Sequence, residues 1–477
     1  MTRETFLWHD YETFGADPRR DRPCQFAALR TDLELEPIGE PIVLYARPAS
    51  DLLPTPEACL ITGITPQDAE EKGVPEYEFA RRIEALMSEP GSCAVGYNNF
   101  RFDDEVTRFL FWRNFLDPYR REYANGNSRF DLIDLLRMTR ALRPEGVEWV
   151  NRDDGTPGFR LEDLAAANGF DTEHAHDALA DVRNTLGMAR RVRTAQPRLW
   201  TWALRLRDKA TVDGLLSKRE VLLHVSSRYP AGEGCIAPVL PLFRHPQIAS
   251  QWLVWNLRVD PAPFADLDDE LLGDLYWTPA ADLPEDMQRL PVKWVRTNRC
   301  PMLSPTGVLD ESAAERTGID LAAAHRHADR LSAESELVTG LMRVFGAPHS
   351  GDEVDPEQAL YAGFVPREDR ARMEPLATMA PEDAAAWINR EAEPFTDPRL
   401  NALLLRFAGR HAPDALDPEP RAEWDAWRRR RLVDDPDLAS IQIDGYRARL
   451  DALRPLHPDR ADLLDALAAW PARLGLV

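Results

Sequence analysis

The chain has few cysteines and no motif that would use them. Its 477 residues include five, Cys24, Cys59, Cys93, Cys235 and Cys300, which are scattered and form no CxxC pair. An odd and dispersed set argues against a disulfide framework and against a zinc site, and it fits a reducing cytosol. We therefore expect a cytoplasmic protein.

Long apolar runs are also absent. No stretch is long enough to span a bilayer, and the first residues lack the basic, apolar and small-residue layout of a signal peptide. Hydrophobic residues make up 44% and charged residues 29% of the chain, as in ordinary soluble globular proteins. No internal repeat or low-complexity tract is present. The length predicts two to four domains. Because no apolar run could span a bilayer, we expect no membrane partner.

Positive charge is in deficit as well. The 58 Lys and Arg residues face 80 Asp and Glu residues, which gives a formal net charge of −22. A nucleic-acid-binding protein usually has a basic balance. However, a metal-dependent nuclease site is itself built of acids, and cations confined to one groove can bind a strand while an acidic remainder suppresses non-specific duplex contacts. The charge counts against nucleic-acid binding without excluding it.

What the chain does contain is a set of carboxylates next to buried strands. An apolar run from Phe6 to Trp8 predicts a short strand that ends in Asp10 and Glu12. Because side chains alternate along a strand, these two carboxylates project to the same side. Two close anions repel unless a cation lies between them, and hard divalent cations prefer carboxylate oxygens. Alone, the D-x-E pattern is more often a solvated strand end, so further acids are needed to support a site.

Two later segments supply a histidine and further acids. Residues 93–95 predict another strand, which is followed by a loop and by a helix start with Asp103 and Asp104. The other segment opens a helix and contains His176 and Asp181. Their separation of five residues corresponds to about 140° beyond one helical turn. Both can border one cleft if His176 lies at the helix entry.

This arrangement resembles the DEDDh exonuclease superfamily, in which four acids and a histidine form the site. The matching positions are Asp10, Glu12, Asp103, His176 and Asp181. The sequences around them, HDYETFG, ITGITPQDAE, GYNNFRFDDEVTR and AHDALAD, are similar to the bacterial exodeoxyribonuclease I family of single-strand-specific 3′→5′ DNA exonucleases. Asp103 is preferred to Asp104 because it follows Phe102 in the family's pattern, whereas Asp104 could cap the helix.

The resemblance implies an α/β multidomain fold. A ribonuclease H-like exonuclease domain is expected at residues 1–195, an SH3-like β-barrel domain with a helical extension at 200–350, and an α-helical domain at 355–477. It also implies hydrolysis with two Mg²⁺ ions, for which Mn²⁺ could substitute, held by Asp10, Glu12, Asp103 and Asp181. His176 would be the general base, since an imidazole pKa of ~6.5 suits proton transfer near neutral pH; His174 is the competing candidate.

Local patterns favour the same division. In the first part, strands are predicted near residues 6–10, 25–31, 41–45 and 93–97, and helices after residues 65, 76, 102, 132, 161 and 178. Short β-type runs broken by Gly and Pro lie between residues 221 and 296. Beyond residue 355 apolar residues recur at helical spacing, and the Arg428–Arg431 run is expected to form a solvated helix face.

Basic and aromatic residues alternate between Arg108 and Tyr123. Single-strand binders use cations that follow phosphates and rings that stack on bases, at roughly 1–3 kcal/mol per base. The alternative is an amphipathic helix that buries Phe111 and Phe115, which we expect of those two rings. The residues predicted to bind substrate are Glu12, Arg108, Trp112, Tyr119, Tyr123, Arg137, Arg143 and Arg160. Arg160 is a stronger candidate for a substrate contact because the matching arginine of the family contacts substrate.

The partners implied by the resemblance are single-stranded DNA and single-strand-binding protein. The acidic C-terminal tail of that protein would dock on a basic and apolar surface that includes Arg143, which is equally a candidate phosphate contact. A monomer with a role in DNA repair and recombination is expected. Three alternatives stay open: a DEDDh exoribonuclease or proofreading-type exonuclease, a catalytically silent single-strand-binding scaffold, and a purely structural role for the Asp10 and Glu12 pair.

Overall fold

The computed structural model of the chain describes residues 4–170, 177–285, 287–346, 354–391 and 393–476. Its contacts divide the chain into two compact units. Met1–Ser128, Glu173–Arg183 and Gly351–Val477 form the first, and Arg129–Thr172 with Asn184–Ser350 form the second. The C-terminal part of the chain therefore folds together with the first strands. The domain boundaries near residues 195 and 350 stay a prediction.

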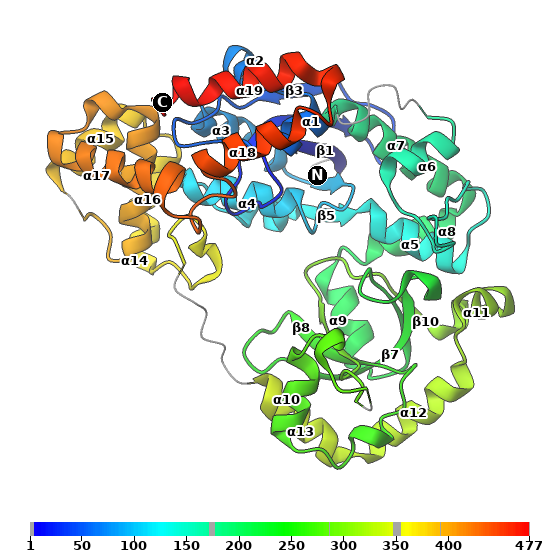
Figure 1. Ribbon diagram of the computed structural model, residues 1–477. Coiled ribbons are helices and arrows are strands. Elements are labelled where there is room, and N and C mark those ends of the chain that lie inside the picture. The colour runs from blue at the N-terminus through cyan, green and yellow to red at the C-terminus, as the bar shows by residue number, and fades with distance from the viewer. Residues whose placement is uncertain (1–3, 171–176, 286, 347–353, 392, 477) are drawn as a thin grey trace. The chain divides into compact units, whose positions relative to one another are not determined.

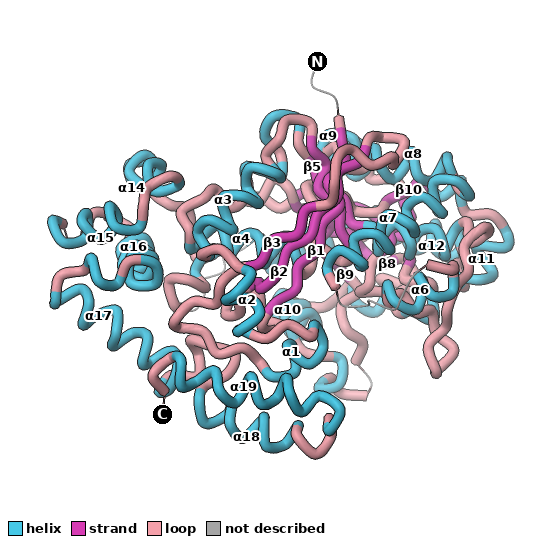
Figure 2. Tube along the Cα trace, turned by 90° about the horizontal axis from the view of Figure 1, so that it is seen from above, coloured by secondary structure: helices cyan, strands magenta, loops and turns pink. Residues whose placement is uncertain are grey.

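A mixed sheet with the order β3-β2-β1-β4-β5 contains the strand that ends in the predicted acids. Its members are β1 (Thr5–Thr13), β2 (Pro23–Thr31), β3 (Ile42–Tyr45), β4 (Ser92–Gly96) and β5 (Ser128–Asp131). Central β1 pairs antiparallel with β2 and parallel with β4, and Figure 2 shows β1, β2 and β3 side by side. The apolar run is buried as expected, because Phe6, Leu7 and Trp8 are each at most 1% exposed.

Helices of the first unit cover this sheet. They are α1 (Pro56–Thr62), α2 (Pro66–Lys72), α3 (Glu76–Met87), α4 (Asp103–Arg113) and the start of α7 (Ala178–Ala195). The predicted start of α2 is confirmed, since Thr65 caps it in a reciprocal pair of hydrogen bonds with Asp68. Phe79 of α3 and Leu110 of α4 pack against Phe26 of the sheet, which fixes both helices on one face.

The C-terminal helices of the first unit are α14 (Arg367–Met373), α15 (Pro381–Arg390), α16 (Pro398–His411), α17 (Pro418–Arg429), α18 (Ile443–Leu453) and α19 (Ala461–Arg473). The helical spacing predicted for this part is confirmed. Leu403 and Phe407 of α16 pack in one cluster with Phe109 and Trp112 of α4, while Leu467 of α19 packs near the α1 region in another. In Figure 1, α18 and α19 accordingly lie beside α1.

A buried ionic cluster joins these helices to the loops around the sheet. Arg22 contacts Glu357 at 2.8 Å, and Arg410 contacts Asp51 at 2.8 Å. Burial alone would raise the pKa of Asp51, but the guanidinium groups around it lower that pKa to about 2. The expectation that the Arg428–Arg431 run is solvated is wrong for Arg431, which is 3% exposed and donates to the Asp51 carbonyl at 3.0 Å.

The second unit contains an antiparallel sheet with the order β10-β6-β7-β8-β9. Its strands are β6 (Leu222–Val225), β7 (Ile236–Arg244), β8 (Gln251–Asn256), β9 (Val292–Arg296) and β10 (Leu303–Pro305). The helices are α5 (Leu132–Leu142), α6 (Leu161–Ala167), α8 (Pro197–Arg205), α9 (Lys209–Ser217), α10 (Asp269–Trp277), α11 (Glu311–Thr317), α12 (Leu321–Ala333) and α13 (Ser335–Gly346). In the part of the chain that the structure describes, no helix has the length and apolarity to cross a bilayer.

Candidate functional site

Three carboxylates converge beside the central strand of the first unit. One oxygen each of Asp10, Glu12 and Asp181 lies within 4.8 Å of the others. Strand β1 pairs with β4 only from Thr5 to Trp8, so both of its acids lie beyond that pairing. The strand does not end there, as the sequence had suggested, because it stays paired with β2 through Thr13. Pairing with β2 holds Asp10 and Glu12 in the strand, with a register shift directly after Glu12. The backbone of neither acid pairs with β4.

Helix α7 carries Asp181, and hydrogen bonds at the start of the helix hold it beside this strand. The Asp177 carboxylate accepts hydrogen bonds from the backbone of Leu179 and Ala180, at 3.1 and 3.2 Å, which stabilises the helix N-terminus. The backbone nitrogen of Ala178 donates to the buried side chain of Gln25 at 3.2 Å. Since Gln25 is the β2 partner of Glu12, this bond fixes the first turn of α7 opposite the acids.

Asp103, on α4, is not one of the three acids within 4.8 Å of one another, but its charge acts on both Asp10 and Glu12. It is 3% exposed, and one of its carboxylate oxygens accepts a hydrogen bond from the backbone nitrogen of Tyr11 at 3.2 Å. Asp104 instead forms an ion pair of 2.7 Å with Arg121, and both side chains are fully buried. Asp104 therefore does not act as the helix cap that the sequence allowed, and the geometry supports Asp103 as the acid of the second motif.

The electrostatics of the group call for a cation. Burial, and then the charges of Asp103 and Glu12, raise the pKa of Asp10 well above its ordinary value. Burial together with Asp181 and Asp103 raises the pKa of Glu12 to about 9, and burial is the main cause that raises the pKa of Asp103 to about 7. A donor set made only of carboxylate oxygens suits a hard divalent cation, which would offset this repulsion.

The predicted base cannot be placed in the same way. His176 and its alternative His174 lie outside the described residues, so the assignment of the base stays a prediction. Asp177, the next residue along the chain, does lie near the group, because its charge raises the pKa of both Asp10 and Glu12. Sequence reasoning missed Asp177 and Gln25. The helix-capping position of Asp177 was readable from the sequence, but the cross-strand position of Gln25 was not.

Comparison with known proteins identifies the relatives of this chain. Family models described as exonuclease, exonuclease I SH3-like domain and exonuclease I C-terminal domain match residues 7–188, 207–347 and 354–474. Exodeoxyribonuclease I of Escherichia coli (strain K12) is 40% identical over 472 residues, which cover 98% of this chain and 97% of the relative. The chain belongs to the exodeoxyribonuclease I family. The predicted family and the predicted fold class are confirmed, and the chain is a hydrolytic nuclease.

Solved exonuclease I structures agree with this membership. Exonuclease I from Methylocaldum szegediense is 45% identical, with a TM-score of 0.92 over 99% of this chain and 100% of the other. E. coli exonuclease I in complex with a dA16 oligonucleotide is 39% identical, with a TM-score of 0.92 over the same shares. Other structures at TM-scores of 0.91 and 0.89 are a zinc-bound E. coli exonuclease I complex with single-stranded DNA and an SSB/exonuclease I structure with an inhibitor.

Two of the predicted DNA contacts of this exonuclease I family member are internal. Arg108 is 4% exposed and contacts Glu105 at 2.7 Å and Glu122 at 2.8 Å. Trp112 is 3% exposed and donates to the Pro356 carbonyl at 2.9 Å. Both side chains thus serve the packing of α4, and their binding of DNA stays a prediction.

The neighbouring aromatic residues divide in the same way. Phe111 and Phe115 are buried as expected, but α4 ends at Arg113, so Phe115 is not a helical residue and has a φ of 57°. Tyr119 is half-buried below the Arg108 guanidinium, 5.4 Å from it. Tyr123 is 68% exposed. Tyr123 is the member of this run that keeps the features of a DNA contact.

The remaining predicted contacts lie in the second unit. Arg137 is 8% exposed and contacts Asp134 at 2.6 Å, and its role as a DNA contact stays a prediction. Arg160 has a side chain that is 79% exposed and lies 3.8 Å from Glu162, at the edge of ion pairing. Arg143 is partly exposed and contacts Asp310 at 3.0 Å. Arg160 remains the stronger candidate for a phosphate contact.

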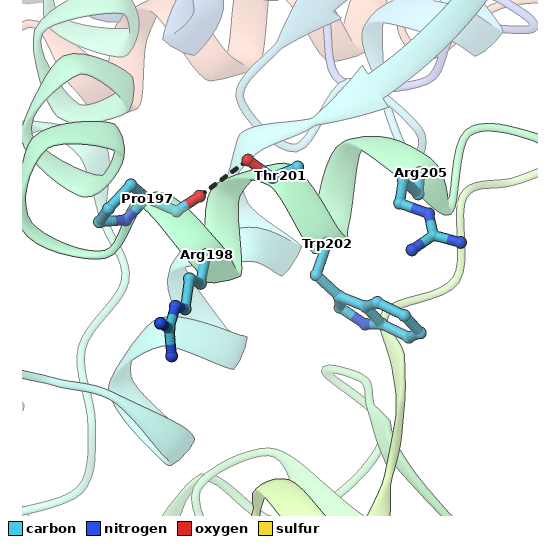
Figure 3. Close-up of a pocket in the computed structure, with 5 residues that line it drawn as sticks. All are labelled: Pro197, Arg198, Thr201, Trp202 and Arg205. Carbon is cyan, nitrogen blue, oxygen red and sulfur yellow. Dashed lines mark hydrogen bonds between the residues drawn. The ribbon is translucent and has the colours of Figure 1, made fainter.

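A surface hollow of about 380 Å³ lies on α8 in the second unit, and none of the predicted acids lines it. Figure 3 shows Arg198, Trp202 and Arg205 projecting from one side of this helix. The Trp202 indole nitrogen donates to the Leu303 carbonyl at 2.8 Å, and the Arg205 guanidinium lies 5.5 Å from the Trp202 ring. The hollow therefore combines two cations with an aromatic ring.

Proposed function

We propose that this chain is a single-strand-specific 3′→5′ exodeoxyribonuclease that releases 5′-mononucleotides with the help of Mg²⁺ and acts in DNA repair and recombination. The observation that carries the proposal is the convergence of Asp10, Glu12 and Asp181 within 4.8 Å in a chain of this family. The E. coli relative solved with dA16 supports single-stranded DNA as the substrate.

Each acid has a distinct part in this proposal. Asp10, Glu12 and Asp181 would hold the cation, and Asp103, fixed by the Tyr11 backbone, would complete the group. A divalent cation bound there lowers the pKa of a bound water and screens phosphate charge. The imidazole of His176, directly before the Asp177 cap, would accept the proton of the attacking water.

The test is a digest of end-labelled oligonucleotides with and without EDTA. We expect shortening of single-stranded DNA from its 3′ end, little cleavage of duplex DNA or RNA, and no product in EDTA. Preferential digestion of RNA would favour the exoribonuclease alternative. A folded, magnesium-replete protein that leaves a free single-stranded terminus uncut would overturn the proposal.

His176→Ala is expected to lower kcat by about 10²- to 10⁴-fold, the usual contribution of a general base. Binding of the metal should persist, because the carboxylates supply the ligands. The measurement is single-turnover digestion across pH, beside titration of Mn²⁺ binding. His174→Ala is the matched control. If His174→Ala loses the rate and His176→Ala does not, the base assignment passes to His174.

We further propose that single-strand-binding protein docks its acidic tail on the second unit. Arg143 donates to the Val308 carbonyl at 2.9 Å, and Trp202 donates to that of Leu303, so the segment from Leu303 to Val308 links both. Trp202→Ala and Arg143→Ala should each weaken binding of a tail peptide by about tenfold, since aromatic and arginine anchors dominate such interfaces. Unchanged anisotropy titrations for both variants, with Leu456→Ala as control, would exclude this surface.

A further inference from the structure

The residue between the two acids of β1 has a side chain that the proposed reaction does not use. Tyr11 lies between Asp10 and Glu12, so its side chain projects to the opposite face of the strand. It is 4% exposed and packs on the ring of Phe26, its partner in β2, with 4.9 Å between the ring centroids. Phe26 also packs against α4. Tyr11 therefore faces the side of the sheet that α4 covers.

Tyr11 is attached to Asp103, at the start of α4, in two ways. Its backbone nitrogen donates to the Asp103 carboxylate at 3.2 Å. Its hydroxyl oxygen lies 3.0 Å from that of Thr107, and the Thr107 hydroxyl donates to the Asp103 carbonyl at 2.8 Å. The side chain and the main chain of Asp103 are thus both held by one residue of the strand that carries Asp10 and Glu12.

The protons of these hydrogen bonds have one arrangement. The Thr107 hydroxyl has a single proton, which goes to the Asp103 carbonyl because a carbonyl can only accept. The Tyr11 hydroxyl must then donate to Thr107. Burial raises the pKa of Tyr11 above its ordinary value, so this hydroxyl keeps its proton at neutral pH. Since Thr107 is fully buried, no water competes for either bond.

Other contacts hold the start of α4 without Tyr11. Asp104 forms its buried ion pair with Arg121, and its backbone nitrogen donates to the Asn99 carbonyl at 2.9 Å. Neither contact involves Tyr11 or Thr107. Loss of the Tyr11 hydroxyl should therefore leave α4 in place. What it removes is one of the two attachments that fix Asp103 to the strand.

We propose that Tyr11 and Thr107 are positioning residues, whose hydroxyl groups set where the Asp103 carboxylate lies relative to the acids of β1. This inference rests on the proposed function and deepens it by naming residues that orient a carboxylate of the cation site. Both hydroxyls are buried on the face of the strand opposite Asp10 and Glu12. Their loss should therefore weaken the use of metal and leave the KM for DNA at saturating Mg²⁺ unchanged.

Tyr11→Phe tests this directly, because it removes the hydroxyl and keeps both the ring and the backbone bond to Asp103. Affinity for Mn²⁺ is measured by electron paramagnetic resonance without DNA, beside the Mg²⁺ dependence of kcat. Both should shift about tenfold toward higher metal concentration. That is the lower end of the ~10- to 100-fold loss expected when a group that orients a metal ligand is removed, since the backbone bond remains.

Tyr446→Phe is the matched control. The Tyr446 hydroxyl is also buried, and it donates to the Leu467 carbonyl at 2.7 Å in another part of the first unit. Its removal costs one buried hydrogen bond, as Tyr11→Phe does, so both variants should unfold at a lower temperature than the wild type. Tyr446→Phe should nevertheless bind Mn²⁺ with wild-type affinity, which separates positioning of Asp103 from a general loss of stability.

Thr107 provides the second half of the test. Thr107→Val should weaken Mn²⁺ binding, and Thr107→Ser, which keeps a hydroxyl, should bind as the wild type does. Adding Tyr11→Phe to Thr107→Val should cost little more, because both changes break one chain of hydrogen bonds. Wild-type Mn²⁺ affinity of Tyr11→Phe, or losses that add as independent effects, would overturn the inference. Because the titration contains no DNA, either result beside normal digestion by the wild type would leave the proposed function standing.

Discussion

Asp10→Asn should abolish hydrolysis, with a loss of at least about a thousandfold in kcat, the size seen when one member of a catalytic unit is removed. Asp10 is the acid whose pKa is affected by every other carboxylate of the group, so its replacement disturbs the whole cation site. The amide has the same shape as the carboxylate, and β1 keeps its pairing with β2 on regular backbone. We therefore expect the variant to fold.

The measurement is single-turnover digestion of single-stranded DNA at saturating metal, with circular dichroism to establish folding. Glu423→Gln, an exposed position of α17, is the matched control for loss of one negative charge and should retain full activity. In the absence of metal, Asp10→Asn should unfold at a higher temperature than the wild type, because it removes repulsion. A folded Asp10→Asn protein that digests DNA at the wild-type rate would contradict the site.

The sequence predicted features that depend on near neighbours. Alternation along β1 placed Asp10 and Glu12 together, and Thr65 and Asp68 were recognised as a helix start because the cap is formed within four residues. These contacts are local, so a short pattern determines them.

Long-range partners explain what the sequence could not predict. The sequence predicted Arg108 and Trp112 as DNA contacts, and it did not predict that they bind Glu122 and Pro356 in the fold. It also predicted a solvated Arg431, whereas this side chain donates to the carbonyl of Asp51, 380 positions away in the chain. Gln25 could not be predicted for the same reason, because its hydrogen bond to the start of α7 joins residues 153 positions apart. The helical repeat shows which face a side chain occupies, but it does not show which segment later covers that face.

The second large effect concerns metal and pH together. In the metal-free protein, folding raises the pKa of Glu12 from 4.5 to about 9 and that of Asp103 from 3.8 to about 7. The folded state then binds more protons than the unfolded state between these values, so the free energy of unfolding should fall as pH rises from about 5 to about 9. Other buried acids of the chain have lowered pKa values, such as Asp51, and they act in the opposite sense at lower pH.

Glu12→Gln isolates the contribution of the site, because it leaves the distant acids unchanged. The variant should show a flatter pH dependence of unfolding than the wild type in EDTA. Mg²⁺ at a fixed concentration, a hundred times the Kd measured at pH 8, should stabilise the wild type by about 2.7 kcal/mol at pH 8. The same concentration should stabilise it less at pH 5, where protons compete for the carboxylates. The variant should gain much less, and it should be inactive. Since the same four carboxylates destabilise the empty site and bind the metal, equal metal stabilisation of both proteins would show that the cation binds elsewhere.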